Sequence, residues 1–413
     1  MLTFDGMSTA EVSRLRRIRL ALLVGALALF ALLYAPQPVL PQFAAAFSLA
    51  PGTVALLVSA GTLGLAVSAI PLGTLSEVVG RRRVMVTALL IAEVIGVALP
   101  FLPNFPLLVA LRLVQGAAVA GLAAVAAAYL ADETGGRDLG TTMGLYVAGT
   151  TIGGMSGRLL GGIAGDYGGW TGGLTAVAVL AGICTVLFVL LLPTERHQQR
   201  QHFRLRPLLD GVRAAATDPG LRAPFAVAAL GMGSFVAVYN VLGFRLIAPP
   251  LSVPPALAAL AFLAYAAGTV TSALAGRFAD RFGRRPVLLT GLGVALAGLA
   301  LMLAGNLVVI LLGLVVFTGG FFAAHSVASG WVGVLAAPSA RGQASAMYQF
   351  AYYGGSSVGG VLGGTAYAHW GWPGMSLVLA CWLALAGVAV LRARRARPQQ
   401  PVRQPVDQVA SES

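Results

Sequence analysis

Long apolar segments constrain this sequence of 413 residues more than any other feature. A bilayer core of roughly 30 Å requires about 20 apolar residues in a helix. About twelve segments satisfy that length: 18–43, 52–76, 84–102, 105–131, 139–165, 171–192, 223–248, 254–276, 286–304, 307–336, 342–368 and 373–391. Because lipid leaves backbone polar groups without partners, we expect each segment to be a helix. Charged residues make up 10% of the chain, against about a quarter in soluble proteins, so we predict an all-α integral membrane protein.

Composition and motifs argue against several other classes of protein. The net charge is +13, but the arginines stand between apolar segments and not along one helix face, so we expect no binding to nucleic acid. Cys184 and Cys381 lie in separate apolar segments without metal-ligand spacing, so we expect neither a metal site nor a disulfide framework. The sequence contains no GxxxxGK[ST] or HExxH pattern. We therefore expect no enzymatic activity, no P-loop and no cofactor.

Arginine-rich loops alternate with uncharged loops along the chain. Arginines cluster at 14–19, 81–83, 277–285 and 392–397, whereas the loops around 47–52, 100–106 and 249–255 carry no charge. The positive-inside rule therefore predicts a cytoplasmic N-terminal tail (1–17), linker (193–221) and C-terminal tail (392–413). The C-terminal tail is rich in Pro, Gln and Ser and is expected to be disordered. All 27 basic residues are arginines, which favours a GC-rich bacterial source and a place in the cytoplasmic membrane.

The sequence contains an internal repeat. The stretch Gly73–Met85 (GTLSEVVGRRRVM) aligns with Gly276–Leu288 (GRFADRFGRRPVL) at an offset of 203 residues. The glycine-rich stretch Tyr146–Trp170 aligns with Tyr348–Trp372 at an offset of 202 residues. We infer two six-helix bundles, 18–192 and 222–391, related by an axis along the membrane normal as in transporters with parallel repeats.

These motifs resemble those of the major facilitator superfamily. Both loops have the pattern G-x-x-x-[DE]-x-x-G-R-R, and Leu111–Gly116 (LRLVQG) is similar to the family's fourth-helix arginine motif. The glycines from Gly144 to Gly162 resemble its fifth-helix antiporter motif, with Arg158 where that motif has proline. The resemblance spans all twelve segments and is greatest to the drug:proton antiporters and sugar-efflux proteins. It implies the major facilitator fold and transport by alternating access.

The paired loops are candidates for a conformational switch. By the repeat, we expect Glu77 to face the start of the span at 342–368, near Arg341, and Asp280 to face the start of the span at 139–165, near Arg137. An acid beside the positive end of a helix dipole gains up to about 1 kcal/mol, and such contacts bias an equilibrium between two states. The alternative is that the arginines only fix the topology. The residues concerned are Gly73, Glu77, Gly80, Arg81, Arg82, Gly276, Asp280, Arg281, Gly283, Arg284, Arg285, Arg137 and Arg341.

Two stripes of glycine are expected to bring helices close together. Glycines spaced four residues apart form one smooth helix face. They are Gly153, Gly157 and Gly161 in the first half and Gly355, Gly359 and Gly363 in the second. One interpretation is close packing inside each half, and the other, implied by the resemblance, is a sliding surface between the halves.

Three charged residues stand deep within predicted spans. Counting residues from the nearest turns places Glu93, Arg112 and Arg158 roughly 12–16 Å below the surface, in one shared layer. Glu93 either forms a buried ion pair with an arginine or carries protons, and an unpaired arginine would bind a substrate oxygen or anion. The partner of Arg158 is Glu93, Asp166 or the substrate. His325 is either a second proton carrier or a neutral, hydrogen-bonded core residue.

Polar residues on spans that face the cavity in this family are candidates for substrate contact: Tyr34, Gln37, Gln115, Tyr239, Asn240, Gln349 and Tyr353. Aromatic walls with a few polar groups are typical of a ligand site. Arginines in place of buried acids favour sugars, metabolites or uncharged drugs over cationic drugs. We predict a monomeric secondary transporter in the lipid bilayer that exports a small organic solute against proton influx. A proton symporter or uniporter for import is the first alternative, and a transport-inactive receptor or scaffold is the second.

Overall fold

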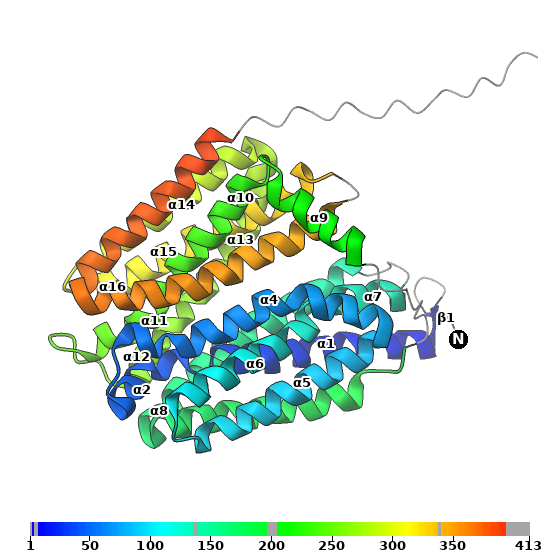
Figure 1. Cartoon of the computed structure of the whole chain (residues 1–413), viewed down its shortest axis with the longest axis horizontal. Coiled ribbons are helices and arrows are strands. Elements are labelled where there is room, and N and C mark those ends of the chain that lie inside the picture. The colour runs from blue at the N-terminus through cyan, green and yellow to red at the C-terminus, as the bar shows by residue number, and fades with distance from the viewer. Residues whose placement is uncertain (1, 4–6, 135–138, 196–204, 338–339, 394–413) are drawn as a thin grey trace, which may run out of the picture.

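The computed structural model describes residues 2–3, 7–134, 139–195, 205–337 and 340–393, and these are almost entirely helical (Figure 1). Two short strands, β1 (Leu2–Thr3) and β2 (Met7–Ser8), pair antiparallel before the first helix. Of the tail predicted to be disordered, residues 394–413 lie outside the described part of the chain.

Six spans precede the linker and six follow it. The first half contains α1 (Thr9–Tyr34), η1 (Gln37–Val39), α2 (Leu40–Phe47), α3 (Pro51–Val54), α4 (Leu56–Val79), α5 (Arg81–Ala98), η2 (Leu99–Phe101), α6 (Phe105–Ala123), α7 (Ala126–Thr134) and α8 (Leu139–Leu191). The linker contains α9 (Leu205–Thr217). The second half contains α10 (Arg222–Ala226), the π-helical turn η3 (Val227–Gly231), α11 (Met232–Ile247), α12 (Pro255–Ala259), η4 (Leu260–Ala264), α13 (Tyr265–Phe282), α14 (Arg284–Leu301), α15 (Leu307–Leu335) and α16 (Arg341–Arg392).

The helices confirm the predicted membrane spans. Ten helical segments of the described chain are long and apolar enough to cross a membrane. Two of them, Thr142–Leu191 and Arg341–Arg392, contain 50 and 52 residues, and about 75 Å of helix is more than twice the thickness of a bilayer core. Both are interrupted by a glycine with positive φ, Gly169 (62°) in α8 and Gly371 (63°) in α16. Each therefore contains two spans, which brings the number to twelve.

Prolines divide the first span into three helical pieces. α1 ends at Tyr34, and the chain continues through Pro36 and Pro38 into η1 and α2. A proline has no N–H, so it cannot donate to the carbonyl four residues earlier. The last carbonyls of α1 consequently need donors from elsewhere in the protein.

The paired loops have the same backbone in both halves. Gly80 ends α4 with φ of 118°, and Gly283 ends α13 with φ of 89°. Side chains with a Cβ rarely adopt this region of φ, so the first glycine of each Gly-Arg-Arg sequence is required by the turn. The repeat in the sequence is thus a repeat in the structure.

The two halves lie beside each other, the first largely blue and cyan and the second largely yellow and orange in Figure 1. One end of the molecule carries α9 and the loops with most of the arginines. There Arg81 pairs with Asp132 at 3.0 Å and Arg14 pairs with Glu133. We call this the arginine-rich end, and we call the opposite end, with the turns near Leu49, 103 and 250, the arginine-poor end.

Direct contacts between the halves gather toward the arginine-poor end. The Nε2 atom of Gln37 donates to Oδ1 of Asn240 across 2.7 Å, and the hydroxyl of Ser357 donates to the carbonyl of Ser59 across 2.8 Å. Gln37 and Ser59 belong to the first half, and their partners belong to the second. The structure is therefore closed at the arginine-poor end.

Candidate functional site

A cavity of about 350 Å³ lies between the halves, a size that suits a small-molecule site. It extends from Arg158 to Ala123, Ser329 and Gln349, which lie toward the arginine-rich end. Six tyrosines line it: Tyr34, Tyr146, Tyr265, Tyr348, Tyr352 and Tyr353. Among the described lining residues there is no Asp or Glu, and Arg158 is the one arginine.

Arg158 lies at the closed end of this cavity and is 2% exposed. Its Nε donates to Oε1 of Gln37 across 2.6 Å, and a terminal nitrogen donates to the carbonyl of Gly154 across 2.6 Å. Gly154 stands one turn earlier on α8, and a Cβ there would lie 3.0 Å from the guanidinium. The glycine therefore makes room for the side chain.

Aromatic rings complete the surroundings of Arg158. Its guanidinium carbon lies 3.9 Å from the ring centre of Tyr34 and 4.5 Å from that of Tyr265, which is within the range of cation–π contacts. Neither Glu93 nor Asp166 forms an ion pair with it among the described residues. Two of the three predicted partners are therefore wrong, and the positive charge meets neutral dipoles and rings.

His325 lines the cavity beside Tyr348. The Tyr348 hydroxyl lies 2.9 Å from Nδ1 of His325 and 3.1 Å from its carbonyl oxygen. A hydroxyl has one hydrogen, and a carbonyl can only accept. With the hydroxyl hydrogen donated to the carbonyl, the hydroxyl oxygen can accept from Nδ1 in the tautomer that carries its hydrogen there, and in that tautomer Nε2 can accept a proton.

The other predicted cavity residues divide into two groups. Tyr34, Gln349 and Tyr353 line the cavity. Tyr239, Gln37, Asn240 and Gln115 are buried outside its described lining. The Tyr239 hydroxyl bonds Oγ1 of Thr318 across 2.7 Å, so this tyrosine packs within the second half.

Arg112 is 1% exposed and makes its contacts inside the first half. Its Nε donates to the carbonyl of Leu57 across 2.8 Å, and one terminal nitrogen donates to that of Leu32 across 3.0 Å. Further hydrogen bonds reach the carbonyl of Leu33 and Oε1 of Gln115. The guanidinium thus caps the end of α1, where Pro36 supplies no donor, and α6 is tied to α1 and α4.

Glu93 belongs to α5, and its carboxylate faces Gly182 in the second part of α8. A Cβ on Gly182 would lie 3.0 Å from its Oε1, and its Oε2 is buried without a hydrogen-bond partner among the described residues. No ion pair joins it to Arg112 or Arg158 within the described chain. The expected buried ion pair is absent among the described residues because the Glu93 carboxylate faces Gly182 of α8, whereas the Arg112 guanidinium is held by carbonyls of α1 and α4.

The acids of the paired loops are exposed. Glu77 and Asp280 form no ion pair with another described residue. Arg341 is exposed as well, and Arg137 lies outside the described residues. The predicted clamp at the arginine-rich end is therefore not formed among the described residues, and it stays a prediction.

The glycine stripes pack inside their own halves. A Cβ on Gly157 would lie 2.6 Å from Cα of Ala31 in α1, and one on Gly359 would lie 2.3 Å from Cα of Gly233 in α11. The remaining stripe glycines contact the same two spans: Gly153, Gly161, Gly355 and Gly363. These contacts fit the first of the two interpretations of the stripes.

Glycines next to the stripes bring the two halves together. A Cβ on Gly162 would lie 2.4 Å from Cβ of Ala259 in α12, and one on Gly364 would lie 2.8 Å from Cα of Gly52 in α3. Gly162 and Gly364 are equivalent in the repeat. Each follows a stripe glycine by one residue, and because consecutive residues are about 100° apart around a helix, both lie on the face next to the stripe. The interpretation of the stripes as the surface between the halves is therefore wrong in this state, and the adjacent face forms that surface.

Four tyrosines of the cavity were not selected from the sequence. Tyr146 and Tyr348 are equivalent in the repeat, and equivalent residues around a central axis face the same cavity, so the repeat contained the signal. Tyr352 stands one turn after Tyr348 on the same helix face. Tyr265 follows the 3-10 segment η4, where tighter turns shift the helical register in a way that the sequence does not display.

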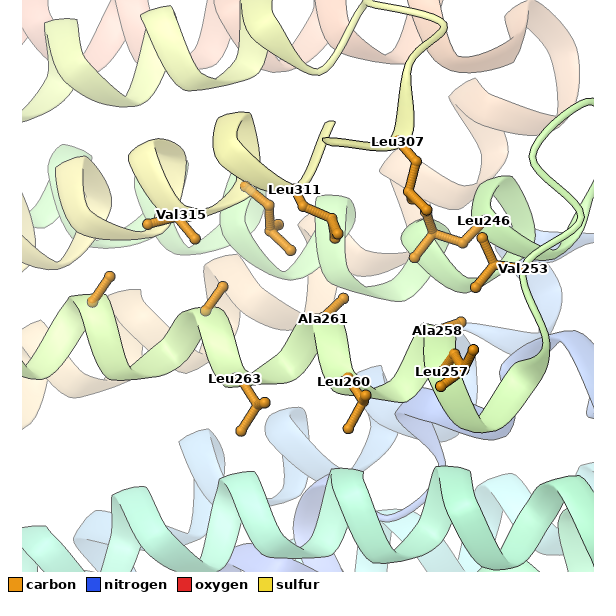
Figure 2. Close-up of a pocket in the computed structure, with 13 residues that line it drawn as sticks. Leu246, Val253, Leu257, Ala258, Leu260, Ala261, Leu263, Leu307, Leu311 and Val315 are labelled. Atoms are coloured by element: carbon orange, nitrogen blue, oxygen red, sulfur yellow. The ribbon is translucent and has the colours of Figure 1, made fainter. Parts of the chain in front are cut away.

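A second hollow, in the second half, is entirely apolar. Figure 2 shows Leu246 of α11, Val253, Leu260 and Leu311 among its lining side chains, all of which are Leu, Val or Ala. It offers no hydrogen-bonding side chain to orient a solute, whereas specific sites combine apolar walls with a few polar groups. The tyrosine-lined cavity is therefore the candidate substrate site.

The comparison with known proteins agrees with this architecture. The family model of the Major Facilitator Superfamily matches residues 22–265 and 225–410. The chain is 41% identical over 379 residues to the inner membrane transport protein YnfM of Escherichia coli (strain K12), with 92% of this chain and 91% of that protein covered. It is 36% identical over 375 residues to the uncharacterized MFS-type transporter YybF of Bacillus subtilis (strain 168), covering 89% and 93%.

Solved structures share the fold at low sequence identity. A mutant of the nucleoside transporter NupG superposes with a TM-score of 0.76 at 16% identity, covering 92% of this chain and 100% of that one. A bacterial homolog of the human lysosomal transporter Spinster, in an inward-facing and unoccupied conformation, also gives 0.76 at 16% identity, covering 94% and 100%. With the twelve spans, the repeated loops and the central cavity, these matches show that the chain belongs to the major facilitator superfamily and is a multi-pass membrane transporter.

Proposed function

We propose that this transporter exports a small neutral or weakly anionic organic solute in exchange for protons. The observation that carries the proposal is the cavity between the halves, with six tyrosines, one arginine and no carboxylate among its described lining residues. Tyrosine rings provide apolar area, and their hydroxyls provide hydrogen bonds. A cationic solute would meet Arg158 without a compensating acid, which favours solutes that accept hydrogen bonds or carry one negative charge.

His325 is the proposed proton carrier. Its imidazole lines the cavity, and in the tautomer that carries its hydrogen on Nδ1 its Nε2 can accept a proton. Histidine is the side chain whose ordinary pKa lies closest to physiological pH. Glu93, the other candidate from the sequence, is not among the described residues that line the cavity.

Export across a bacterial inner membrane is supported by the antiporter-like glycine motif and by the Escherichia coli relative, which is described as an inner membrane transport protein. We propose that a single chain is the working unit, because one chain contains both halves and the complete cavity. In this assignment the arginine-rich end faces the cytoplasm, and the cavity takes up its solute from there.

Purified protein in liposomes with an imposed pH gradient tests the proposal. The panel consists of uncharged sugars, aromatic amides and aromatic carboxylates, each radiolabelled. An antiporter accumulates its solute when the lumen is acidic, because protons leave as the solute enters. A symporter accumulates it when the lumen is alkaline, and a uniporter ignores the gradient.

The variant Arg158→Ala tests whether Arg158 binds the solute. Arg158→Ala should reduce uptake of a carboxylate solute by about tenfold or more, as expected for loss of a charge-assisted hydrogen bond. Accumulation with an alkaline lumen would support the import alternative instead. Absence of uptake for every compound, with the protein folded, would favour the receptor or scaffold.

A further inference from the structure

A chain of buried polar side chains crosses between the two halves at the closed end of the cavity. Nε of Arg158 donates to Gln37 Oε1 across 2.6 Å, and Gln37 Nε2 donates to Asn240 Oδ1 across 2.7 Å. Each of the three residues is 2% exposed. Arg158 and Gln37 belong to the first half and Asn240 belongs to α11, so the second bond helps to hold the halves together.

The planar guanidinium of Arg158 also contacts aromatic rings of both halves. Tyr34 of α1 lies on one side at 3.9 Å, while Tyr265 and Phe262 of the second half lie at 4.5 Å and 5.5 Å from its guanidinium carbon. These rings and the Gln37 oxygen are neutral. The arginine therefore holds the closure with weak neutral acceptors, although a guanidinium binds a carboxylate more strongly and in a two-pronged geometry.

The second half has no arginine at the position equivalent to Arg158. The repeat places Gly360 where the first half has Arg158. A Cβ on Gly360 would lie 2.8 Å from Nδ2 of Asn240 and 2.8 Å from Oγ of Ser59. The glycine thus allows Asn240 to come close to the first half, where Gln37 donates to it.

We propose that Arg158, Gln37 and Asn240 form a latch that the transported solute opens. The solute is an aromatic or apolar molecule with one carboxylate, and it enters the cavity from the arginine-rich end. Its carboxylate takes over Nε of Arg158 and displaces Gln37, which then no longer holds Asn240 in place. The halves separate at the arginine-poor end as a result. This latch rests on the proposed function for its trigger, but its resting contacts exist without a solute.

Distance measurements between spin labels test the latch. Cysteines replace Ala46 and Ser252, two exposed residues on opposite halves of the arginine-poor end, after Cys184 and Cys381 have been changed to serine. Without any solute, Gln37→Ala should raise the ratio of long to short distances about fivefold, as expected for one buried neutral hydrogen bond.

A matched glutamine provides the control. Gln42 lies in α2 near the same end, and its Nε2 donates to the carbonyl of Gly165 across 2.9 Å, inside the first half. Gln42→Ala should leave the distances unchanged. Equal distance distributions in wild type and Gln37→Ala would overturn the latch, and so would an equal shift in both variants. This comparison needs neither solute nor transport, so it is independent of the proposed function.

The trigger is tested with benzoate and indole-3-acetate against their uncharged amides. The acids should raise the long-distance population of the wild-type protein, and the amides should not. Arg158→Gln should abolish the response, and Arg158→Lys, which keeps the charge, should retain part of it. Amides that act as well as acids, acids without effect, or a full response in Arg158→Gln would each overturn the assignment of a carboxylate solute.

Discussion

Substitution of Arg112 tests whether this buried arginine stabilises the first half or binds the solute. The sequence made it a candidate for substrate binding, whereas the structure surrounds it with carbonyls of α1 and α4 and the amide of Gln115. If the second view is right, Arg112→Ala should lower the stability of the first half in the absence of any solute.

The magnitude follows from the hydrogen bonds that are lost. Arg112 makes four, and a bond to a charged group contributes about 1.5–3 kcal/mol. Leu32 and Leu33 lie in the last turn of α1, where carbonyls lack regular helical donors. The Leu32 carbonyl keeps a long bond of 3.4 Å from the Ala35 N–H, whereas the Leu33 carbonyl has no other donor within the described chain. Release of the buried charge to water offsets much of the remainder. We therefore expect a net loss of about 3–6 kcal/mol, or a melting temperature lower by at least about 6 °C.

Thermal unfolding of the purified protein in detergent, followed by tryptophan fluorescence without solute, measures this effect. Arg83→Ala is the control, because Arg83 is exposed and the structure gives it no hydrogen bond or ion pair within the described chain, and its melting temperature should change by less than about 2 °C. An Arg112→Ala variant that melts with the wild type but no longer binds solute would refute the argument and return Arg112 to the substrate site.

Three further outcomes follow from the contacts. Gly157→Leu should reduce the yield of folded protein, because a Cβ there meets Cα of Ala31 at 2.6 Å, whereas Gly144→Leu enters open space; equal size-exclusion profiles would contradict this. Glu93→Gln should keep gradient-driven uptake and melt no lower than the wild type, because Oε2 of Glu93 is buried without a described partner; loss of the gradient dependence would place the proton site there. His325→Gln should retain solute binding but lose the response of uptake to the pH gradient, and an unchanged response would exclude His325 as the carrier.

The spans and the repeat were predictable from the sequence because both depend on local patterns. Apolar length determines whether a helix crosses a bilayer, and Gly80 and Gly283 recur because the same turn is needed twice. Position along a helix can be counted from the sequence, since each residue advances the helix by about 1.5 Å. The direction in which a side chain points around the helix axis cannot be obtained from that count. Glu93 and Arg112 were expected in one layer, but they face different neighbours, so the expected ion pair does not form.

The partner of a glycine face likewise depends on tertiary packing. Gly161 and Gly162 are consecutive, yet the first packs within its own half and the second against Ala259 of the other half. The four-residue spacing identified a smooth face correctly but not the helix that covers it. One signal was available and was not used: Pro36 shows in the sequence that the end of α1 lacks a donor, and a buried arginine is a suitable replacement.

The difference between the two buried arginines lies in their acceptors. The acceptors of Arg112 are mainly backbone carbonyls of its own half. These carbonyls keep their positions relative to Arg112 when the halves move as rigid bodies, so the interaction energy of Arg112 does not change with such a movement. The acceptors of Arg158 include a side chain that reaches across to Asn240 and two rings of the second half, so its energy changes when the halves separate. Only a contact whose energy differs between two states can shift the equilibrium between them. By this criterion Arg158 can take part in alternating access and Arg112 can only support it, although both residues are buried arginines.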